Sequence, residues 1–557
     1  MARSDSNAMV APPQDSDDPD DRAVRGAVDA YLAAARDAML RLVAPERRVD
    51  PALLDRHQFV AHGFAWMATS GAALHAVQLW RARLAATDAL TDRDALIAEL
   101  GSAELILQLG TGIAMSQGET ARPGDLGLAA HAAALLSTPS IARLLQRATP
   151  AARERLAQLL AADDLEPSYG DPEIDDMAES VRRFARARVA PHAQAWHVAD
   201  ALVPMDIVDG VAALGIFGLT IPSDYGGLGL GKAVMCATTE ELSAASLIVG
   251  SLATRAEIAG DLIALSGTPA QRAAYLPRIA AGTCLPTAVF TEPDIGSDLA
   301  GLKTRAVRDG AVYRIHGAKT WITHAARADL MTLLVRTGRL EDRHDGLSMF
   351  LAEKPRGTAT DPFPVAGLSG SEIQVLGYRG LKEYELAFDG FEVPASQLLG
   401  GVEGQGFRQL MATFESARIQ TAARAVGVAR AALGEARAYA QTRRQFGRPI
   451  AEFPRVAHKL STMAIETTIA RELTLSAARA KDSGRRCDIE AGMAKLFAAR
   501  VAWSAADNAV QIHGGNGYAA EYPASRLLVD ARILNIFEGA AEIQAHVIAR
   551  GLLSARN

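Results

Sequence analysis

The segment YELAFDGFEV, residues 384–393, alternates apolar and polar side chains with a period of two, as a half-buried strand does. Similar segments, each bounded by Gly, Asp or Pro, precede it: AVYRIHG (311–317), LMTLLVRT (330–337) and LSMFLAE (347–353). We therefore predict a β domain over residues 286–400. This region decides the fold class, because the sequence on both sides of it has a helical pattern.

The flanking regions have apolar residues at i, i+3 and i+4 and few β-branched runs, as in QTAARAVGVARAALGEARAYAQTRR (420–444). Residues 1–22 lack apolar periodicity and are predicted to be a disordered tail. The polar stretch 162–172 is predicted to be a linker. We predict a multidomain, mainly helical α+β protein, with helical domains at 23–165, 173–285 and 406–557 around the β domain.

The composition excludes several classes of protein. The 557 residues are 49% hydrophobic and 22% charged, which suits several cores and excludes a disordered chain. The net charge of -6 argues against a nucleic-acid binder. No apolar run has membrane-spanning length, and the first residues lack a signal peptide's apolar segment. Cys236, Cys284 and Cys487 are too far apart to predict a disulfide framework or a thiol metal cluster. We expect a cytoplasmic protein without membrane, metal or nucleic-acid partners.

Glycine-rich and arginine-rich segments give only weak evidence here. The run GGLGLGK (226–232) fits a phosphate loop, but Ala233 stands where a Ser or Thr must bind magnesium, so we predict a turn between helices. The chain has 50 arginines against eight lysines, a bias that makes any arginine cluster poor evidence of an anion site.

Five segments contain residues that could carry chemistry, although each also has an ordinary structural explanation. They are FTEPDIGSD (290–298), a polar turn; KTWIT (319–323), with an indole and a hydroxyl on one strand face; RRQFG (443–447), at a helix end; QIHGGNGY (511–518), a glycine-rich break; and NIFEGAAEIQ (535–544), with a carboxylate after an apolar approach.

Taken together, in this order and spacing, these segments resemble the acyl-CoA dehydrogenases from about residue 173 to the end of the chain. The segments FARARVAPHAQAW (184–196), GLTIPSDYGGLGL (218–230) and RRQFGRPI (443–450) extend the resemblance. It implies a helical domain, a β-barrel-like domain and a four-helix bundle. Here an extra N-terminal helical domain precedes them.

The resemblance also implies FAD as cofactor. The residues implied to bind it are Phe290, Thr291, Ser297, Trp321, Ile322, Thr323, Arg443, Phe446, Gln511, Gly514 and Gly515. Trp321 would cover the isoalloxazine, and Thr323 would bond its reactive edge. Arg443 and the 511–515 turn would reach the FAD of a neighbouring subunit, which implies a homo-oligomer.

Glu538 matches the family's catalytic base. A minority of members place the base near residue 417, but Ala417 cannot act as one. The resemblance implies substrate contacts from Ser297, Glu415, Arg418 and Gly539. The family removes the α-proton of an acyl-CoA, transfers the β-hydride to FAD and passes electrons to an electron-transferring flavoprotein.

The N-terminal extension, with GIAMSQGETARPGDLG (112–127), and the later segments SEIQVLGYRGLKEYELAFDG (371–390) and FESARIQTAARAVG (414–427) resemble family members that act in the ethylmalonyl-CoA pathway. This resemblance implies (2S)-methylsuccinyl-CoA as substrate and mesaconyl-CoA as product. A generic short- or branched-chain acyl-CoA dehydrogenase is the alternative, and a non-catalytic flavin-binding scaffold is an alternative of another class. The sequence does not identify the residue that would bind the far carboxylate. We expect a dimer, with a tetramer as the alternative.

Overall fold

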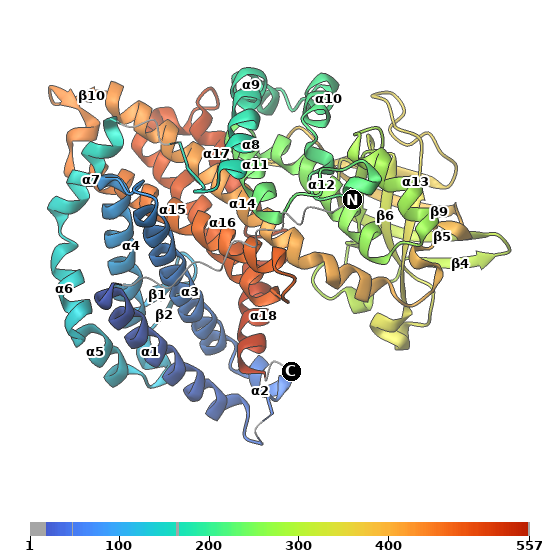
Figure 1. The fold of residues 1–557 in the computed structure, drawn as a ribbon. Coiled ribbons are helices and arrows are strands. Elements are labelled where there is room, and N and C mark those ends of the chain that lie inside the picture. The colour runs from blue at the N-terminus through green and yellow to red at the C-terminus, as the bar shows by residue number, and fades with distance from the viewer. Residues whose placement is uncertain (1–17, 47, 163–165, 555–557) are drawn as a thin grey trace, which may run out of the picture. The chain divides into compact units, whose positions relative to one another are not determined.

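The structure is a computed structural model that describes residues 18–46, 48–162 and 166–554 (Figure 1). The chain divides into two compact units. Unit 1 comprises Met1–Asp164, Ala464–Leu473 and Ala549–Asn557, and unit 2 comprises Leu165–Met463 and Thr474–Ile548. The predicted α+β class with mainly helical content is confirmed.

Unit 1 is a helical assembly with one short hairpin. Its helices and strands are α1 (Pro19–Val43), α2 (Pro51–Arg56), α3 (Gln58–Ala86), α4 (Asp92–Thr111), β1 (Ile113–Ala114), β2 (Thr120–Ala121), α5 (Ala129–Ser137), α6 (Pro139–Arg147) and α7 (Pro150–Ala162). Helix starts follow from capping residues, as at α4, where the Thr91 side chain accepts a hydrogen bond from the Asp94 N–H. Helix α3 is apolar around its circumference, and buried residues occur along its whole length.

The predicted tail of residues 1–22 is too long, because α1 begins at Pro19 with Asp18 as its N-cap. Residues 1–17 of that prediction lie outside the described residues. Two segments from far along the chain also belong to unit 1, which the sequence did not predict. A Cβ on Gly101 of α4 would lie 3.1 Å from Ile469 Cδ1, and Arg36 Nε donates to the Leu552 carbonyl at 3.0 Å.

Unit 2 begins with helices and ends with helices. The first group is α8 (Pro172–Phe184), α9 (Ala190–Val198), α10 (Met205–Ala213), α11 (Lys232–Ala245), α12 (Leu247–Ser266) and α13 (Pro269–Ala280). The last group is α14 (Gly406–Thr442), α15 (Pro454–Asp482), α16 (Asp488–His513), α17 (Pro523–Ile533) and α18 (Ala541–Leu553), and the hairpin β10 (Arg444–Gln445) and β11 (Arg448–Pro449) follows α14. Residues 464–473 of α15 and 549–553 of α18 belong to unit 1. Because α11 starts at Lys232, the glycine run before it is a turn, as predicted.

In chain order, the strands of a seven-stranded sheet follow the first helical group and precede the second. Its strands are β3 (Pro286–Val289), β4 (Arg305–Asp309), β5 (Val312–Thr323), β6 (Leu330–Arg336), β7 (Leu347–Glu353), β8 (Leu368–Ile373) and β9 (Glu383–Pro394). The order is β3-β6-β4-β5-β9-β8, with β7 paired to β6. Strand β6 runs parallel to β3 and β4, and the other pairs are antiparallel.

One register shift matters for the site. Lys319 pairs with Leu386, whereas Ile322 pairs with Tyr384, so β5 has one residue more than β9 across this interval. This β-bulge gives Trp321 a φ of 58° and leaves its side chain 56% exposed, while Thr323 is only 7% exposed. Trp321 and Thr323 therefore do not share a face as they would on a regular strand.

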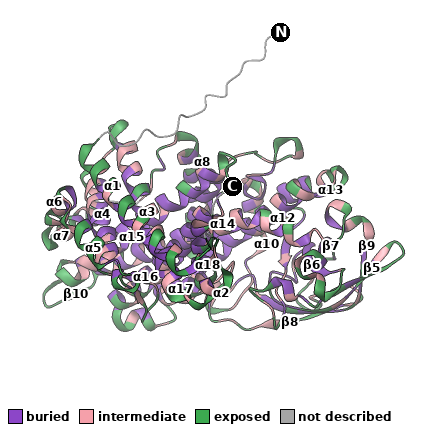
Figure 2. Cartoon of the chain, turned by 90° about the horizontal axis from the view of Figure 1, so that it is seen from below, coloured by how far each residue is buried: buried purple, intermediate pink, exposed green. Residues whose placement is uncertain are grey.

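Helix α14 is buried along most of its length (Figure 2). Buried polar groups fix it to α11 and α12: Arg430 forms an ion pair with Glu241 at 2.6 Å, and Gln420 donates to Glu257. Glu257 also accepts from Lys232 at 2.6 Å. These bonds set the separation of α12 and α14, both of which supply site residues. Among the described residues, no helix has the length and apolarity needed to cross a bilayer.

Candidate active site

Glu538 lies on the turn between α17 and α18, with a φ of 53° and a side chain that is 14% exposed. Its carboxylate points at α14. Arg424 Nη2 donates to Oε1 at 2.8 Å, and the Thr421 hydroxyl lies 3.1 Å from Oε2. Thr421 and Arg424 are three residues apart and so share one helix face. The predicted base therefore meets polar partners in a site that is mostly buried.

A second arginine approaches the same carboxylate from α12. Arg255 Nη1 lies 3.9 Å from Glu538 Oε1, and its guanidinium is buried. Arg424 is fully buried, donates to Ser251 at 3.1 Å and stacks on the Phe537 ring at 4.8 Å. Two buried guanidinium groups thus meet one carboxylate, which leaves an excess of positive charge among these three groups.

Arg255 also reaches the β domain. Its Nη2 donates to the Thr323 hydroxyl at 2.8 Å and lies 3.4 Å from the Tyr378 hydroxyl. Thr323 in turn donates to the Glu383 carboxyl, 2.8 Å away. Burial raises the pKa of Glu383 to about 7, even though Arg255 and Thr323 act to lower it. This chain of contacts joins the Glu538 carboxylate to the end of β5.

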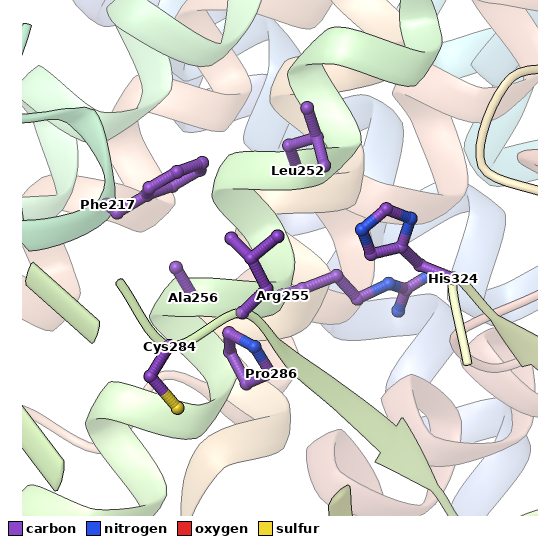
Figure 3. A pocket seen from close by; sticks show the side chains of 8 residues that line it. Phe217, Leu252, Arg255, Ala256, Cys284, Pro286 and His324 are labelled. Carbon is purple, nitrogen blue, oxygen red and sulfur yellow. The ribbon is translucent and has the colours of Figure 1, made fainter. Parts of the chain in front are cut away.

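A small cavity adjoins Arg255 (Figure 3). Its remaining walls are formed by Phe217, Leu252, Ala256, Cys284, Leu285, Pro286 and His324. Neither ring nitrogen of His324 nor Arg255 Nε has a hydrogen-bond partner among the described residues. Burial, together with nearby arginines, lowers the pKa of His324 to about 3, so this imidazole is neutral at pH 7. The surface that lines the cavity is almost entirely apolar, and these three nitrogen atoms are buried in residues that adjoin it.

Several predicted flavin residues lie beside the bulge of β5. The Phe290 carbonyl accepts from Lys319 Nζ at 2.8 Å, and the Thr291 carbonyl accepts from the Thr320 N–H at 3.0 Å. Ser297 is exposed on the turn that follows. The Ile322 side chain belongs to the buried core of the β domain, so only its backbone is available to a ligand.

The other predicted flavin residues lie where α14 and α16 end. Tyr439 stacks on His513 with ring centroids 4.2 Å apart, and Asn516 Nδ2 donates to the Tyr439 hydroxyl at 3.0 Å. These contacts tie the hairpin after α14 to the glycine turn after α16. The predicted residues in this region are all exposed: Arg443, Phe446, Gln511, Gly514 and Gly515. Phe446 is 93% exposed at a φ of 48°.

The predicted substrate contacts Glu415, Arg418 and Gly539 have different surroundings. Glu415 accepts from Lys481 Nζ at 2.6 Å, so its carboxylate is engaged in an ion pair within the helical bundle. Gly539 lies directly after the base at a φ of 90°, where a Cβ would lie 2.0 Å from Gln544 Nε2. Arg418 stacks on Phe414 at 5.7 Å, and Ala417 beside it is buried.

Sequence reasoning missed five residues around Glu538: Arg255, Tyr378, Glu383, Thr421 and Arg424. The helical spacing of Thr421 and Arg424 was a usable signal, because residues three apart on α14 share a face. The arginine excess hid it. Arg255, Tyr378 and Glu383 come from separate elements, and only the fold brings them together.

Three family models match this chain: the acyl-CoA dehydrogenase N-terminal domain over residues 171–283, the middle domain over 287–391 and the C-terminal domain over 404–553. This chain belongs to the acyl-CoA dehydrogenase family. It is 55% identical to the (2S)-methylsuccinyl-CoA dehydrogenase of Cereibacter sphaeroides, and the match covers 94% of this chain and 96% of that protein.

Solved structures of the family have the same fold. Butyryl-CoA dehydrogenase from Megasphaera elsdenii matches with a TM-score of 0.65 and 30% identity, covering 70% of this chain and all of that one. A glutaryl-CoA dehydrogenase from Mycobacterium smegmatis in complex with FADH2 matches with a TM-score of 0.63 and 28% identity, covering 70% of this chain and 96% of that one.

The family is FAD-dependent, and the residues of this chain fit that cofactor. At the bulge, the Trp321 indole is exposed to solvent, while the residues on either side of it in β5 are buried. The indole is a flat apolar surface on which a second ring system would stack. Gly514 and Gly515 are exposed and have no atom within 4 Å of a notional Cβ, so this turn leaves room for a ligand to approach its backbone closely.

Proposed function

We propose that this chain oxidises (2S)-methylsuccinyl-CoA to mesaconyl-CoA with FAD as its cofactor. The relative of that activity covers nearly the whole chain, including the N-terminal extension. The observation that carries the proposal is the pair of buried guanidinium groups, Arg255 and Arg424, beside the Glu538 carboxylate. A site for a plain hydrocarbon acyl chain has no use for two buried positive charges.

The chemistry of the substrate explains this placement. In a succinyl thioester the free carboxylate is attached to the β-carbon, one bond from the carbon that loses the hydride. A cation for this carboxylate must therefore lie beside the reacting carbons and beside the base. Arg255 meets that requirement, because it lies between Glu538 and Thr323. Arg424, on α14, meets the same requirement, because its guanidinium donates to the Glu538 carboxylate.

In this mechanism Glu538 removes the α-proton, and FAD, when bound beside Trp321, would supply the acceptor for the β-hydride. Arg424 and Arg255 hold the substrate carboxylate through charge-assisted hydrogen bonds. Binding of that carboxylate releases the Glu538 oxygen from Arg424, so that it faces the α-carbon. Hydrogen-bond donors aimed at the thioester oxygen stabilise the enolate-like charge that develops there.

The proposal extends to partners and assembly. We propose that electrons pass to an electron-transferring flavoprotein and that the protein works in the cytoplasm as a homodimer. The exposed set that includes Arg443, Phe446 and Gln511 supports completion of each FAD site by a neighbouring subunit. Light scattering on the FAD-bound protein tests the dimer, and a tetramer would refute it.

The test of the reaction uses matched thioesters. 2-Methylbutyryl-CoA replaces the carboxylate of methylsuccinyl-CoA with a methyl group and keeps the branch. With an artificial electron acceptor, we expect kcat/KM for methylsuccinyl-CoA to exceed those for 2-methylbutyryl-, isobutyryl-, butyryl- and glutaryl-CoA by at least about 100-fold.

Two other results would each reject part of the proposal. Preference for a monocarboxylic thioester would make the protein a generic acyl-CoA dehydrogenase. Failure of every acyl-CoA to bleach the flavin without oxygen would favour a non-catalytic scaffold. Glu538→Gln should keep FAD bound and abolish flavin reduction, and unchanged reduction would remove Glu538 as the base.

A further inference from the structure

The turn that carries Glu538 has an unusual backbone. Glu538 and Gly539 both have positive φ, at 53° and 90°. A non-glycine residue in the left-handed region persists only where its surroundings hold it there. The turn is anchored at its base, because Asn535 donates to the Ala499 carbonyl and accepts from the Ala541 N–H, both at 3.1 Å. Its tip, residues 538–540, needs further support.

Two buried side chains donate hydrogen bonds to carbonyl groups at the tip of the turn. Lys495 of α16 donates from Nζ to the Gly539 carbonyl at 2.5 Å, and Gln544 of α18 lies 3.2 Å from the Glu538 carbonyl. Both side chains are fully buried. The carbonyl groups of Glu538 and Gly539 thus point into the protein, toward α16 and α18.

The trans peptide geometry fixes the opposite side of the turn. In a trans peptide unit the N–H points away from the carbonyl. With the two carbonyls held inward, the N–H groups of Gly539 and Ala540 point outward, and neither donates to another group of the described residues. Consecutive free N–H groups next to a left-handed residue form a concavity that binds anionic oxygen.

Lys495 lies in a crowded charged environment. Glu538 on the turn and Glu542 on α18 favour its ammonium form, while Arg418 and Arg424 on α14 oppose it. Burial is the largest influence, and together these lower the pKa of Lys495 to about 7. An ammonium makes a stronger hydrogen bond to a carbonyl than a neutral amine does.

We propose that Lys495 is a positioning residue for the reaction: its ammonium holds the Gly539 carbonyl inward and thereby aims the Glu538 carboxylate and the free N–H groups of the turn at the substrate. The inference rests on the proposed role of Glu538 as the base. Lys495 itself touches neither the substrate nor the reacting atoms.

The test compares two buried lysines. Lys354 is 5% exposed and donates from Nζ to the Ala326 carbonyl at 3.0 Å, in the β domain. Lys354→Met therefore controls for the loss of a buried amine bonded to a backbone carbonyl. In FAD-loaded protein, we expect Lys495→Met to lower the anaerobic rate of flavin reduction roughly 10- to 100-fold, with KM for the thioester changed less than about threefold. Lys354→Met should leave both values within about twofold of the parent.

The pH profile separates positioning from simple packing. The ammonium of Lys495 is present below its pKa and lost as the pH rises, so we expect flavin reduction by the parent protein to fall above about pH 7. Lys495→Arg keeps a protonated donor at this position and should extend activity to higher pH. Lys495→Met should show no such alkaline fall.

The outcomes distinguish this inference from the proposed function. If Glu538→Gln is inactive but Lys495→Met behaves like Lys354→Met, the positioning role is wrong and the base stands. If Lys495→Met does not fold, Lys495→Arg decides: an alkaline limb identical to the parent's rejects the inference. If Glu538→Gln remains active, Glu538 is not the base and this inference falls with it, whereas the proposed function is decided separately by the thioester comparison.

Discussion

Three residues around one carboxylate define the chemistry of this protein at the residue scale. Arg424 and Arg255 lie 2.8 and 3.9 Å from Glu538 Oε1, and Thr421 lies 3.1 Å from Oε2. A guanidinium in so dry a site strongly favours an anionic ligand, because removal of one partner of a buried ion pair costs about 3–5 kcal/mol. The proposed function therefore couples substrate selection and base chemistry at this point.

Arg255→Met tests that coupling. We expect kcat/KM for methylsuccinyl-CoA to fall about 1,000-fold, because the substrate carboxylate loses a buried cation. The value for 2-methylbutyryl-CoA should fall far less or rise. The ratio of kcat/KM for the two thioesters, measured on the same variant, is independent of how much of that variant is folded and loaded with FAD, and so serves as the control. An equal loss for both thioesters would contradict recognition of the carboxylate by Arg255.

Glu383 gives a prediction about stability and pH. Burial raises its folded-state pKa to about 7, above the ordinary value of 4.5 for a glutamate, so folding holds a proton that the unfolded chain releases. This group therefore stabilises the fold less as the pH rises from about 4.5 to 7, by up to about 3 kcal/mol.

Glu383→Gln should flatten this dependence, so that Tm falls less between pH 5.5 and pH 8 than in the parent protein. Glu372→Gln, which changes a partly exposed carboxylate paired with Lys382, is the control and should keep the parent's dependence. Calorimetry of the FAD-bound proteins measures the difference. Equal slopes for Glu383→Gln and the parent would exclude a raised pKa at Glu383.

The sequence predicted Glu538 from its place in IFEGAAEIQ, and the structure places its carboxylate within a charged, mostly buried site. Its role as the base stays a prediction until it is assayed. Arg255 could not be predicted, because one arginine among 50 carries no signal until folding places it beside Glu538.

At the scale of elements, local patterns predicted strands and helices well. Segments with period-two alternation became β5, β6, β7 and β9. The bulge in β5 was not predictable from alternation, because it depends on how β5 pairs with β9. The bulge decides which way the Trp321 side chain faces. The alternation in β5 therefore predicted the strand but not the orientation of this residue.

Helix packing offers a matched pair of glycines on α14. A Cβ on Gly427 would lie 2.6 Å from the Glu240 carbonyl oxygen of α11, whereas one on Gly434 would meet no atom within 4 Å. Gly427→Ala should destabilise the protein by about 1–3 kcal/mol through overpacking. Gly434→Ala should stabilise it by about 0.5–1 kcal/mol through helix propensity. Urea unfolding measures both, and equal effects would contradict close packing at Gly427.

At the scale of the whole molecule, unit 1 is built from three separate stretches of the chain. The sequence predicted an independent helical domain, 23–165, because apolar periodicity describes each helix but not its partners. The segment 464–473 of α15 contributes buried Ile465, Ile469 and Leu473 to this unit. The extension is therefore not a simple addition to the flavoenzyme.

Deletion of residues 1–164 tests this arrangement. We expect the shortened chain to expose the apolar face of the 464–473 segment and to self-associate or precipitate, since large exposed apolar patches drive association. Sedimentation velocity compares it with the full chain at equal concentration. A shortened chain with the full chain's sedimentation behaviour and Tm would show that unit 1 is dispensable for covering this segment.

The bond between Arg36 and the Leu552 carbonyl joins residues 516 positions apart. During synthesis at roughly 5–20 residues per second, helix α1 leaves the ribosome about 25–100 s before its partner exists. Helix α1 can pack early against α3, α5 and α6, but its bond to the Leu552 carbonyl has to wait until the end of synthesis. During that interval the apolar helix faces of the incomplete unit 1 must avoid non-native association with one another and with other chains. Unit 1 can therefore be completed only after the segment 549–554 has been made.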